Sequence, residues 1–214
     1  HPDRVDVEGL RHASLQLHAL LEPISACTEL DRLRGLEGDA ATWYFQSVNE
    51  LILQNQTAFR FSERSRRPPL DPFNALISFA YTLLAHDCAA ALEAVGLDPY
   101  VGFLHRDRPG RASLALDLME ELRGVLADRF VLTLINNRVV LPGQFKRREN
   151  GAILMTDDGR KAVLAAWQAR KREEITHPYL NEKLRWGLVP YAQALLLARH
   201  IRRDLDAYPP FFWK

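Results

Sequence analysis

Residues 102–123 carry the densest group of side chains able to do chemistry in this 214-residue chain. His105 lies in an arginine-rich loop, and three carboxylates follow it in a segment of helical character: Asp117, Glu120 and Glu121. Their spacing of i, i+3 and i+4 places Asp117 beside both glutamates on one face of a helix. Like charges on one face repel one another, and a cation relieves that repulsion. The stretch therefore predicts a place where a divalent metal and a phosphate meet.

An imidazole and two carboxylates form an ordinary ligand set for Mg²⁺ or Mn²⁺, with positions left for water and phosphate. Histidine is the softer ligand and favours Mn²⁺. Glu37 is the best candidate for the missing carboxylate. The spacing alone also fits a solvated acidic face balanced by Arg123, and an acidic residue such as Glu37 is favoured near a helix N-terminus by the dipole.

Other chemical signals in the sequence are weaker. The pair His86-Asp87 imitates the dipeptide of metal-dependent phosphohydrolases, but it lies in an apolar helical pattern without a completing histidine set. There is no P-loop, dinucleotide-binding glycine motif, nucleophile elbow or zinc spacing. A metal-dependent phosphohydrolase of small substrates and a non-catalytic helical DNA-binding or scaffold module remain the alternatives to metal-dependent chemistry on DNA.

Basic residues are grouped, although the chain as a whole carries a net charge of only +1. Local basic runs on a neutral chain suit a protein with one nucleic-acid face, whereas any single run also fits a solvated helix face or loop tip. The runs are Arg60, Arg64, Arg66 and Arg67; Arg106, Arg108 and Arg111; Lys146, Arg147 and Arg148; and Arg199, His200, Arg202 and Arg203.

The two cysteines, Cys27 and Cys88, form no Cys-x-x-Cys pair. Cys88 lies in an apolar helical pattern, which indicates an inert buried thiol, a reducing cytosol and no disulfide framework. The longest apolar segment, residues 75–84, is too short and too polar to span a bilayer, and no signal peptide is visible.

Helical periodicity dominates the elements that must position these residues, and it predicts an all-α fold with one small hairpin. Asp71-Pro72 starts a helix that is apolar nearly all round and therefore central, and Gly96 ends it. Asn150-Gly151 marks the hairpin turn. The tail, residues 208–214, is not helical, and its aromatic side chains are expected to dock on the domain or on a partner. Expected helices cover about residues 10–21, 36–53, 71–95, 114–123, 130–136, 156–172 and 179–203, with Ser113 and Thr156 as N-caps, Pro23 as a stop and Pro190 as a bend.

Three blocks of this sequence resemble the CRISPR-associated adaptation integrase family, the endonucleases that insert new spacers into CRISPR arrays. They read LEGDAATWYF (36–45), RRPPLDPFNALISFAYTLL (66–84) and GLDPYVGFLHRDRPGRASLALDLMEELR (96–123). The later stretches LTLINN (132–137), His177-Pro178 and YPPFFWK (208–214) resemble the subtype I-C branch. The resemblance covers nearly the whole chain.

The resemblance implies that residues 1–214 form the helical catalytic domain, with the family's N-terminal β-rich domain absent from this chain. It places the metal ligands at Glu37, His105 and Glu120, with Asp117 as a supporting acid. Many members have aspartate where Glu120 stands and arginine where Thr42 stands, so this chain departs from the pattern there.

The implied activity is a metal-dependent DNA endonuclease and integrase that joins the 3′-hydroxyl ends of new spacer DNA into the repeat array by transesterification, with Mg²⁺ or Mn²⁺. The implied partners are double-stranded DNA, a second copy in a homodimer of the full-length protein, a small adaptation subunit bridging two dimers and a processing nuclease. No membrane is involved, and the location is the prokaryotic cytoplasm. The expected phosphate contacts are Arg66, Arg67, Arg106, Arg108 and Arg111.

Overall fold

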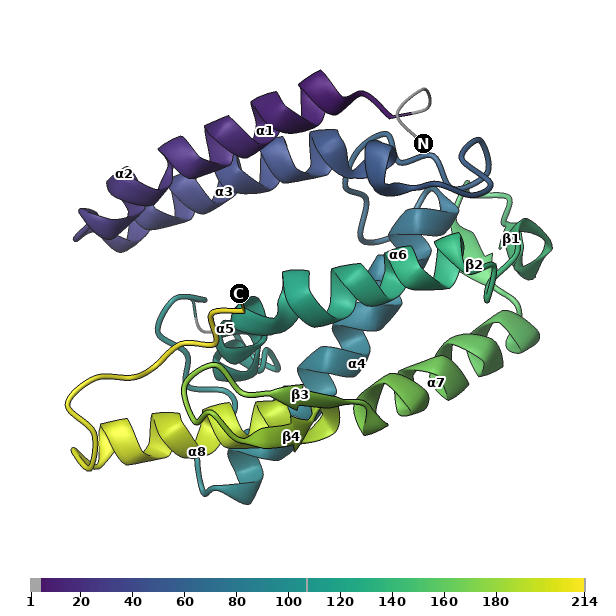
Figure 1. The fold of residues 1–214 in the computed structure, drawn as a ribbon. Helices are drawn as coiled ribbons and strands as arrows, with labels where there is room; N and C mark the ends of the chain where they lie inside the picture. Colours follow the sequence, from purple (N-terminus) through teal and green to yellow (C-terminus); the bar gives the residue numbers. More distant parts are fainter. Residues whose placement is uncertain (1–4, 107, 214) are drawn as a thin grey trace.

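The computed structural model describes residues 5–106 and 108–213 (Figure 1). The described part is rich in helices and contains two separate two-stranded antiparallel hairpins. The prediction of a helical fold is therefore confirmed, but the structure has a second hairpin where only one was predicted.

The first three helices form an arm that runs along one side of the molecule (Figure 1). They are α1 (Val7–Ala19), α2 (Leu21–Ser25) and α3 (Leu30–Ser47). Pro23 does not stop a helix. It lies in the first turn of α2, where a missing N–H leaves no hydrogen bond unmade. A short 3₁₀ turn, Val48–Leu51, follows α3.

The helix that carries Glu37 begins six residues earlier than the expected start at Leu36. Gly35 and Gly38 weaken the apolar pattern, but α3 passes through both because a glycine costs only about 1 kcal/mol in a helix interior. Glu37 therefore lies in the middle of α3, and the interpretation of Glu37 as a helix-start residue is wrong.

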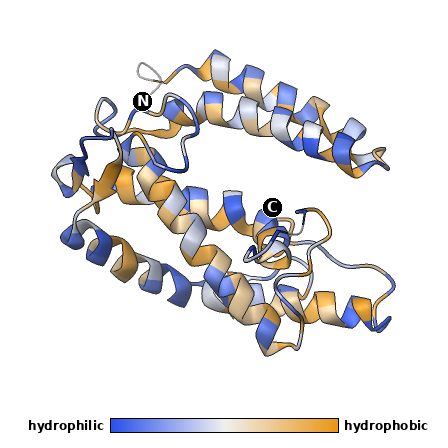
Figure 2. Cartoon of the chain, turned by 180° about the vertical axis from the view of Figure 1, so that it is seen from behind, coloured by the Kyte–Doolittle hydropathy of each residue, from blue (hydrophilic) through white to orange (hydrophobic). Residues whose placement is uncertain are grey.

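The central helix α4 (Pro72–Ala94) passes through the middle of the body as expected. The Asp71 carboxylate accepts a hydrogen bond from the Asn74 N–H at 2.7 Å, and Gly96 follows the helix at φ +81°. Ten of its residues are buried, Cys88 among them. By length and composition alone its 23 residues could cross a membrane, a test that buried core helices also pass, so the prediction of a segment too short and too polar applies to residues 75–84 and not to the whole helix. Apolar colours predominate along it, whereas the surrounding helices mix polar and apolar stretches (Figure 2).

One rod contains the acidic helix and the next apolar segment. It consists of α5 (Ser113–Leu122), a π-helical segment (Arg123–Asp128) and α6 (Arg129–Asn136). Ser113 is not the N-cap: Ala112 holds that position, and the Ser113 hydroxyl donates to the Arg106 carbonyl at 3.2 Å. The two expected helices are thus joined through a change of helical register.

The first hairpin matches expectation: β1 (Phe145–Arg147) pairs with β2 (Ile153–Met155), and Gly151 in the turn has φ +81°. Thr156 caps α7 (Asp157–Arg172) through the Gly159 N–H. The second hairpin, β3 (Glu174–Thr176) with β4 (Lys183–Arg185), occupies part of the expected last helix.

The last helix, α8 (Val189–Ile201), therefore begins later than expected, and Pro190 lies in its first turn instead of at a bend. The cause is a turn closed by His177, whose Nδ1 accepts from the N–H groups of Tyr179 and Leu180 at 3.3 and 3.2 Å. The tail returns to the body, where Phe211 is buried against Trp186 and His177. Docking of the tail on the domain is confirmed for Phe211.

Candidate metal and DNA site

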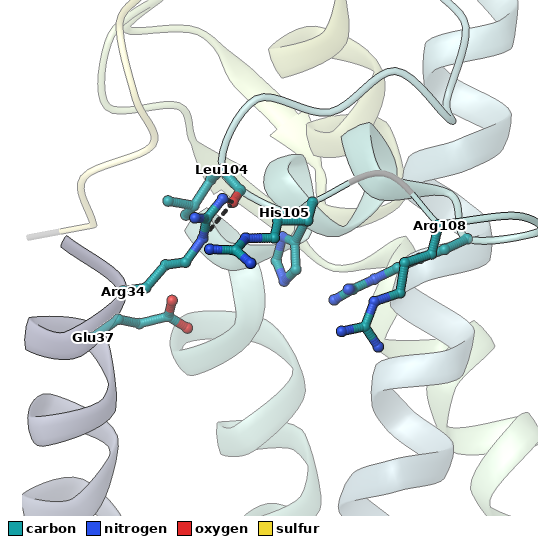
Figure 3. A pocket seen from close by; sticks show the side chains of 7 residues that line it. Arg34, Glu37, Leu104, His105 and Arg108 are labelled. Atoms are coloured by element: carbon teal, nitrogen blue, oxygen red, sulfur yellow. Dashed lines mark hydrogen bonds between the residues drawn. The ribbon is translucent and has the colours of Figure 1, made fainter. Parts of the chain in front are cut away.

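A pocket of about 370 Å³ brings together two predicted ligands that are far apart in sequence. Glu37 reaches it from α3, and His105 from the loop between α4 and α5 (Figure 3). The Glu37 carboxylate points toward the same space as the His105 ring. The lining residues are Arg34, Glu37, Leu104, His105, Arg106, Arg108 and Arg111.

Asp117 holds His105 and its loop. Its Oδ1 lies 2.7 Å from Nδ1 of the His105 ring and accepts from the His105 N–H at 2.9 Å. Its Oδ2 accepts from the N–H groups of Phe103 and Leu104 at 2.7 and 3.1 Å. With Nδ1 donating to a carboxylate, Nε2 is the ring nitrogen left to act as an acceptor or metal ligand. The Asp117 side chain is only 1% exposed, so a solvated acidic face is wrong for this residue.

The loop can lie this close to α5 because residue 102 is glycine. A Cβ at Gly102 would come within 2.6 Å of the Ser113 Cβ and 3.0 Å of the Asp117 Oδ2. The first contact is closer than real Cβ atoms show and the second is unusually tight, so a side chain here would push the loop away from α5.

Glu120 lies beside His105 but is already paired. Its Oε1 is 4.0 Å from the His105 Nε2, and Nη1 of Arg123 donates to both of its oxygens at 2.7 and 2.6 Å. Burial raises the pKa of Glu120, Arg123 opposes that rise, and the charge of Glu37 adds to it. The expected balance by Arg123 is thus present, but in a partly buried pair instead of on a solvated face.

The donor types fit a hard divalent cation, yet the ligands are not gathered around one point. No three His, Cys, Asp or Glu side chains within the described residues are close enough together to hold a metal ion. His105 and Glu120 come nearest to the required arrangement, and Glu37 faces them from a separate helix. Metal binding would therefore need one Glu120 oxygen, which now accepts a hydrogen bond from Arg123, to bind the ion as well. It would also need the Glu37 carboxylate to move closer to His105 and Glu120.

The expected phosphate-binding arginines divide into three groups. Arg108 and Arg111 line the pocket, and the described residues show no ion pair between either of them and a carboxylate. Arg106 also lines the pocket, but its guanidinium donates to Asp31 of the arm at 2.7 Å. The two remaining arginines, Arg66 and Arg67, are exposed in the segment between α3 and α4 and do not line the pocket.

Arg34 is a pocket residue that the sequence reasoning missed. Its Nε and Nη2 both donate to the Leu104 carbonyl, at 3.0 and 2.6 Å, and its Nη1 donates to Asp31 at 2.6 Å. It therefore ties the arm to the residue preceding His105. Its position three residues before Glu37, on one face of a helix, is the signal that could have identified it.

A family model described as CRISPR associated protein Cas1 matches residues 2–169 of the chain. The chain belongs to the Cas1 family. It is 60% identical over 197 residues to CRISPR-associated endonuclease Cas1 2 of Rhodospirillum rubrum, covering 92% of this chain and 57% of that protein. It is 50% identical over 214 residues to CRISPR-associated endonuclease Cas1 1 of Chlorobaculum tepidum, covering 100% of this chain and 62% of that protein. The chain thus spans less than two thirds of the length of these curated Cas1 relatives.

The fold agrees with a solved Cas1-containing assembly. A chain of the structure described as "Partial Cas6-RT-Cas1--Cas2 complex" superposes with a TM-score of 0.82 at 27% sequence identity, covering 98% of this chain and 61% of that one.

Two other acidic residues of this Cas1 chain have structural partners. Glu121 accepts from Gln193, from the Tyr208 hydroxyl and from the Phe211 N–H at 2.7, 2.6 and 2.8 Å. Asp87 accepts from Trp167 and Lys171 at 3.2 and 2.6 Å, so it joins α4 to α7. The partners of Asp87 leave the phosphohydrolase interpretation of His86-Asp87 without support.

Proposed function

We propose that residues 1–214 form the catalytic domain of a DNA endonuclease and integrase of CRISPR adaptation. The observation that carries the proposal is the Asp117-held His105, whose Nε2 lies 4.0 Å from Glu120 and whose ring lines a pocket together with Glu37 and arginines. Membership of the Cas1 family and the endonuclease names of the relatives support it.

Glu37, His105 and Glu120 would hold Mg²⁺ or Mn²⁺. When bound, such an ion neutralises charge on the non-bridging oxygens of the reacting phosphate. Asp117 keeps the proton of His105 on Nδ1 and the ring in place. Arg108 and Arg111 contact the phosphates on either side and position the strand without reading bases.

The proposed reaction is a transesterification. The 3′-hydroxyl oxygen of the incoming duplex attacks a phosphorus atom at the edge of a repeat and loses its proton. The bond from that phosphorus to the bridging 3′-oxygen of the repeat strand breaks, and the departing oxygen takes up a proton. Water in place of the hydroxyl gives endonucleolytic cleavage by the same steps.

The proposed partners are double-stranded DNA, a second copy of the full-length protein, a small adaptation subunit and a processing nuclease. A Cas2 subunit named in the assembly of similar fold supports the small subunit. We further propose that the β-rich domain of the family occupies part of the length that the relatives have beyond this chain, and that the protein works in the prokaryotic cytoplasm.

Three substitutions in the full-length protein test the proposal: Glu37→Ala, His105→Ala and Glu120→Ala. Each is expected to lower strand joining in Mn²⁺ by about 100-fold or more while duplex binding changes little, since uncompensated loss of a metal ligand removes transition-state stabilisation. Asp39→Ala, an exposed carboxylate on α3, is the matched control. Joining at wild-type rates in all three variants overturns the assignment. Hydrolysis of free nucleotides without activity on DNA would favour the phosphohydrolase alternative.

A further inference from the structure

A buried carboxylate lies between the arm and the core helix. Asp128 ends the π-helical segment and is 4% exposed. It accepts a hydrogen bond from the Tyr81 hydroxyl of α4 at 2.7 Å. The hydroxyl of Tyr44, on α3 of the arm, lies close enough to interact with the same carboxylate. Asp128 thus has one tyrosine on each side, Tyr81 from the core helix and Tyr44 from the arm.

The Tyr81 side leads to a candidate metal ligand. The guanidinium carbon of Arg123 lies 4.7 Å from the centroid of the Tyr81 ring, within the range of a cation–π contact. The same guanidinium donates to both oxygens of Glu120. Asp128 therefore orients Tyr81, Tyr81 supports Arg123, and Arg123 holds Glu120.

The π-helical segment makes this arrangement possible. Arg123 and Asp128 are its first and last residues, five apart. In an α-helix with 3.6 residues per turn, residues five apart point about 140° away from each other. The wider turn of a π-helix, with its i→i+5 hydrogen bonds, brings such residues nearer to one face. Both contact Tyr81 here, Arg123 through its guanidinium and Asp128 through its carboxylate.

The Tyr44 side leads to the other carboxylate ligand. Tyr44 follows Glu37 by seven residues on α3. A spacing of seven is about two helical turns, so the two side chains leave α3 on nearly the same face. The main packing neighbours of α3 are α1, α2 and the 3₁₀ turn, and not the helices of the body. Besides the stacking of Phe45 on Phe61, α3 meets the body through the polar contacts of Arg34 and Asp31 with the His105 loop, so few contacts fix the position of Glu37.

We propose that Asp128 is a positioning residue that sets Glu37 of the arm in register with Glu120 of the body, through Tyr44 on one side and Tyr81 on the other. The inference rests on the proposed function, because the need for this register is the metal that the two carboxylates share. The arrangement also explains why a carboxylate is buried here, since a group so far from water must be hydrogen-bonded.

Metal affinity in the full-length protein without DNA tests the inference. Tyr44→Phe and Tyr81→Phe each remove one hydroxyl and keep the ring. Each is expected to weaken Mn²⁺ binding, followed by electron paramagnetic resonance, by about tenfold, the lower end of the range for residues that orient metal ligands. Asp128→Asn should weaken it at least as much.

Tyr208→Phe is the matched control. It removes the hydrogen bond from the Tyr208 hydroxyl to Glu121, another partly buried tyrosine–carboxylate pair on the rod that contains α5 and the π-helical segment. It should lower the melting temperature yet leave Mn²⁺ affinity within about twofold of wild type, because Glu121 does not face the pocket. Equal weakening in Tyr208→Phe would show a general loss of stability and overturn the inference.

A distance measurement separates this inference from the proposed function. Spin labels at the exposed positions Asp39 and Glu93 measure the distance between the arm and the core helix α4. Cys27 is replaced by Ser so that it is not labelled. Tyr44→Phe should broaden the label-to-label distance distribution, and an unchanged distribution overturns the inference wherever the metal binds. If instead Glu37→Ala and Glu120→Ala leave Mn²⁺ binding intact while Tyr44→Phe releases the arm, the proposed function fails and the role of Asp128 in seating the arm stands.

Discussion

Glu120 and Glu121 are adjacent in sequence but are held by different parts of the protein. Arg123 donates to both oxygens of Glu120 next to His105. Glu121 is held by the C-terminal tail through Tyr208 and Phe211, and by α8 through Gln193. One residue thus faces the candidate site, and its neighbour fastens the helix that carries the site.

Glu121→Gln should destabilise the protein without changing the site directly. The amide places a donor where Tyr208, Gln193 and the Phe211 N–H all donate, and the cost should be about 1–3 kcal/mol of unfolding free energy. Urea unfolding measures it. Metal affinity equal to wild type in the folded variant is the second expectation, and a large loss of affinity would contradict the separation of the two glutamates.

The pH dependence of that stability difference has a definite sign. Burial raises the pKa of Glu121 above its ordinary 4.5. The folded state then binds the proton more tightly than the unfolded chain, so the contribution of Glu121 to stability falls as the pH rises from about 4.5 through the raised pKa. The unfolding free energy of wild type should therefore exceed that of Glu121→Gln by a larger margin at about pH 5 than at about pH 7. A gap that is constant with pH, or that moves the other way, would refute this.

Asp117→Asn should damage both the loop and the histidine. The two carboxylate oxygens of Asp117 accept four hydrogen bonds, whereas an amide has only one acceptor oxygen. The amide also no longer fixes the proton on Nδ1 of His105. Losses of about 10- to 100-fold in Mn²⁺ affinity are expected, as for other groups that orient a ligand. Isothermal titration is the measurement, with Asp39→Asn as the control.

Gly102→Ala tests the close approach of the loop to α5. The added Cβ meets Ser113 at 2.6 Å, so the variant should lose about 1–3 kcal/mol of stability, as overpacked sites do. Gly143→Ala is the matched control, because a Cβ there has no atom within 4 Å. Thermal unfolding compares them, and equal melting temperatures would argue against a tight contact.

Substituting the arginines of the pocket should affect strand joining, whereas substituting those of the segment before α4 should affect only DNA binding. Arg108→Ala with Arg111→Ala is expected to abolish joining and to lower the slope of log K against log salt by about 2, since each phosphate contact contributes about 0.9. Arg66→Ala with Arg67→Ala should lower the slope if these residues contact phosphates, but leave the joining rate at saturating DNA near wild type. A loss of joining at saturation in the second pair would place these arginines in the reaction itself.

Local signals explain what the sequence predicted well. Asp71-Pro72, Thr156 and Asn150-Gly151 act within a few residues of themselves, so α4, α7 and the first hairpin followed from them. The second hairpin has strands of three residues, and its turn depends on the His177 ring, so helical periodicity wrongly assigned its second strand, β4, to the last helix.

The site itself was only partly readable. The helix spacing brought Asp117, Glu120 and Glu121 together, but it gave no hint that the tail would bind Glu121. Glu37 was a candidate carboxylate from the sequence, but only the family resemblance assigned it to the same site as His105, because no local pattern links residues that far apart. The contact of Asp128 with Tyr81 depends on a π-helical register that residue spacing read as an α-helix cannot show.

The arm has a consequence for how activity can be controlled. Glu37 belongs to α3, and His105 and Glu120 belong to the body, so under the proposed function a molecule with a displaced arm keeps two ligands out of three. The turnover rate then depends on the fraction of molecules in which the arm lies against the body. A protein or DNA strand that binds α1 or α2, away from the reacting phosphate, would change that fraction and so raise or lower cleavage without contacting the metal.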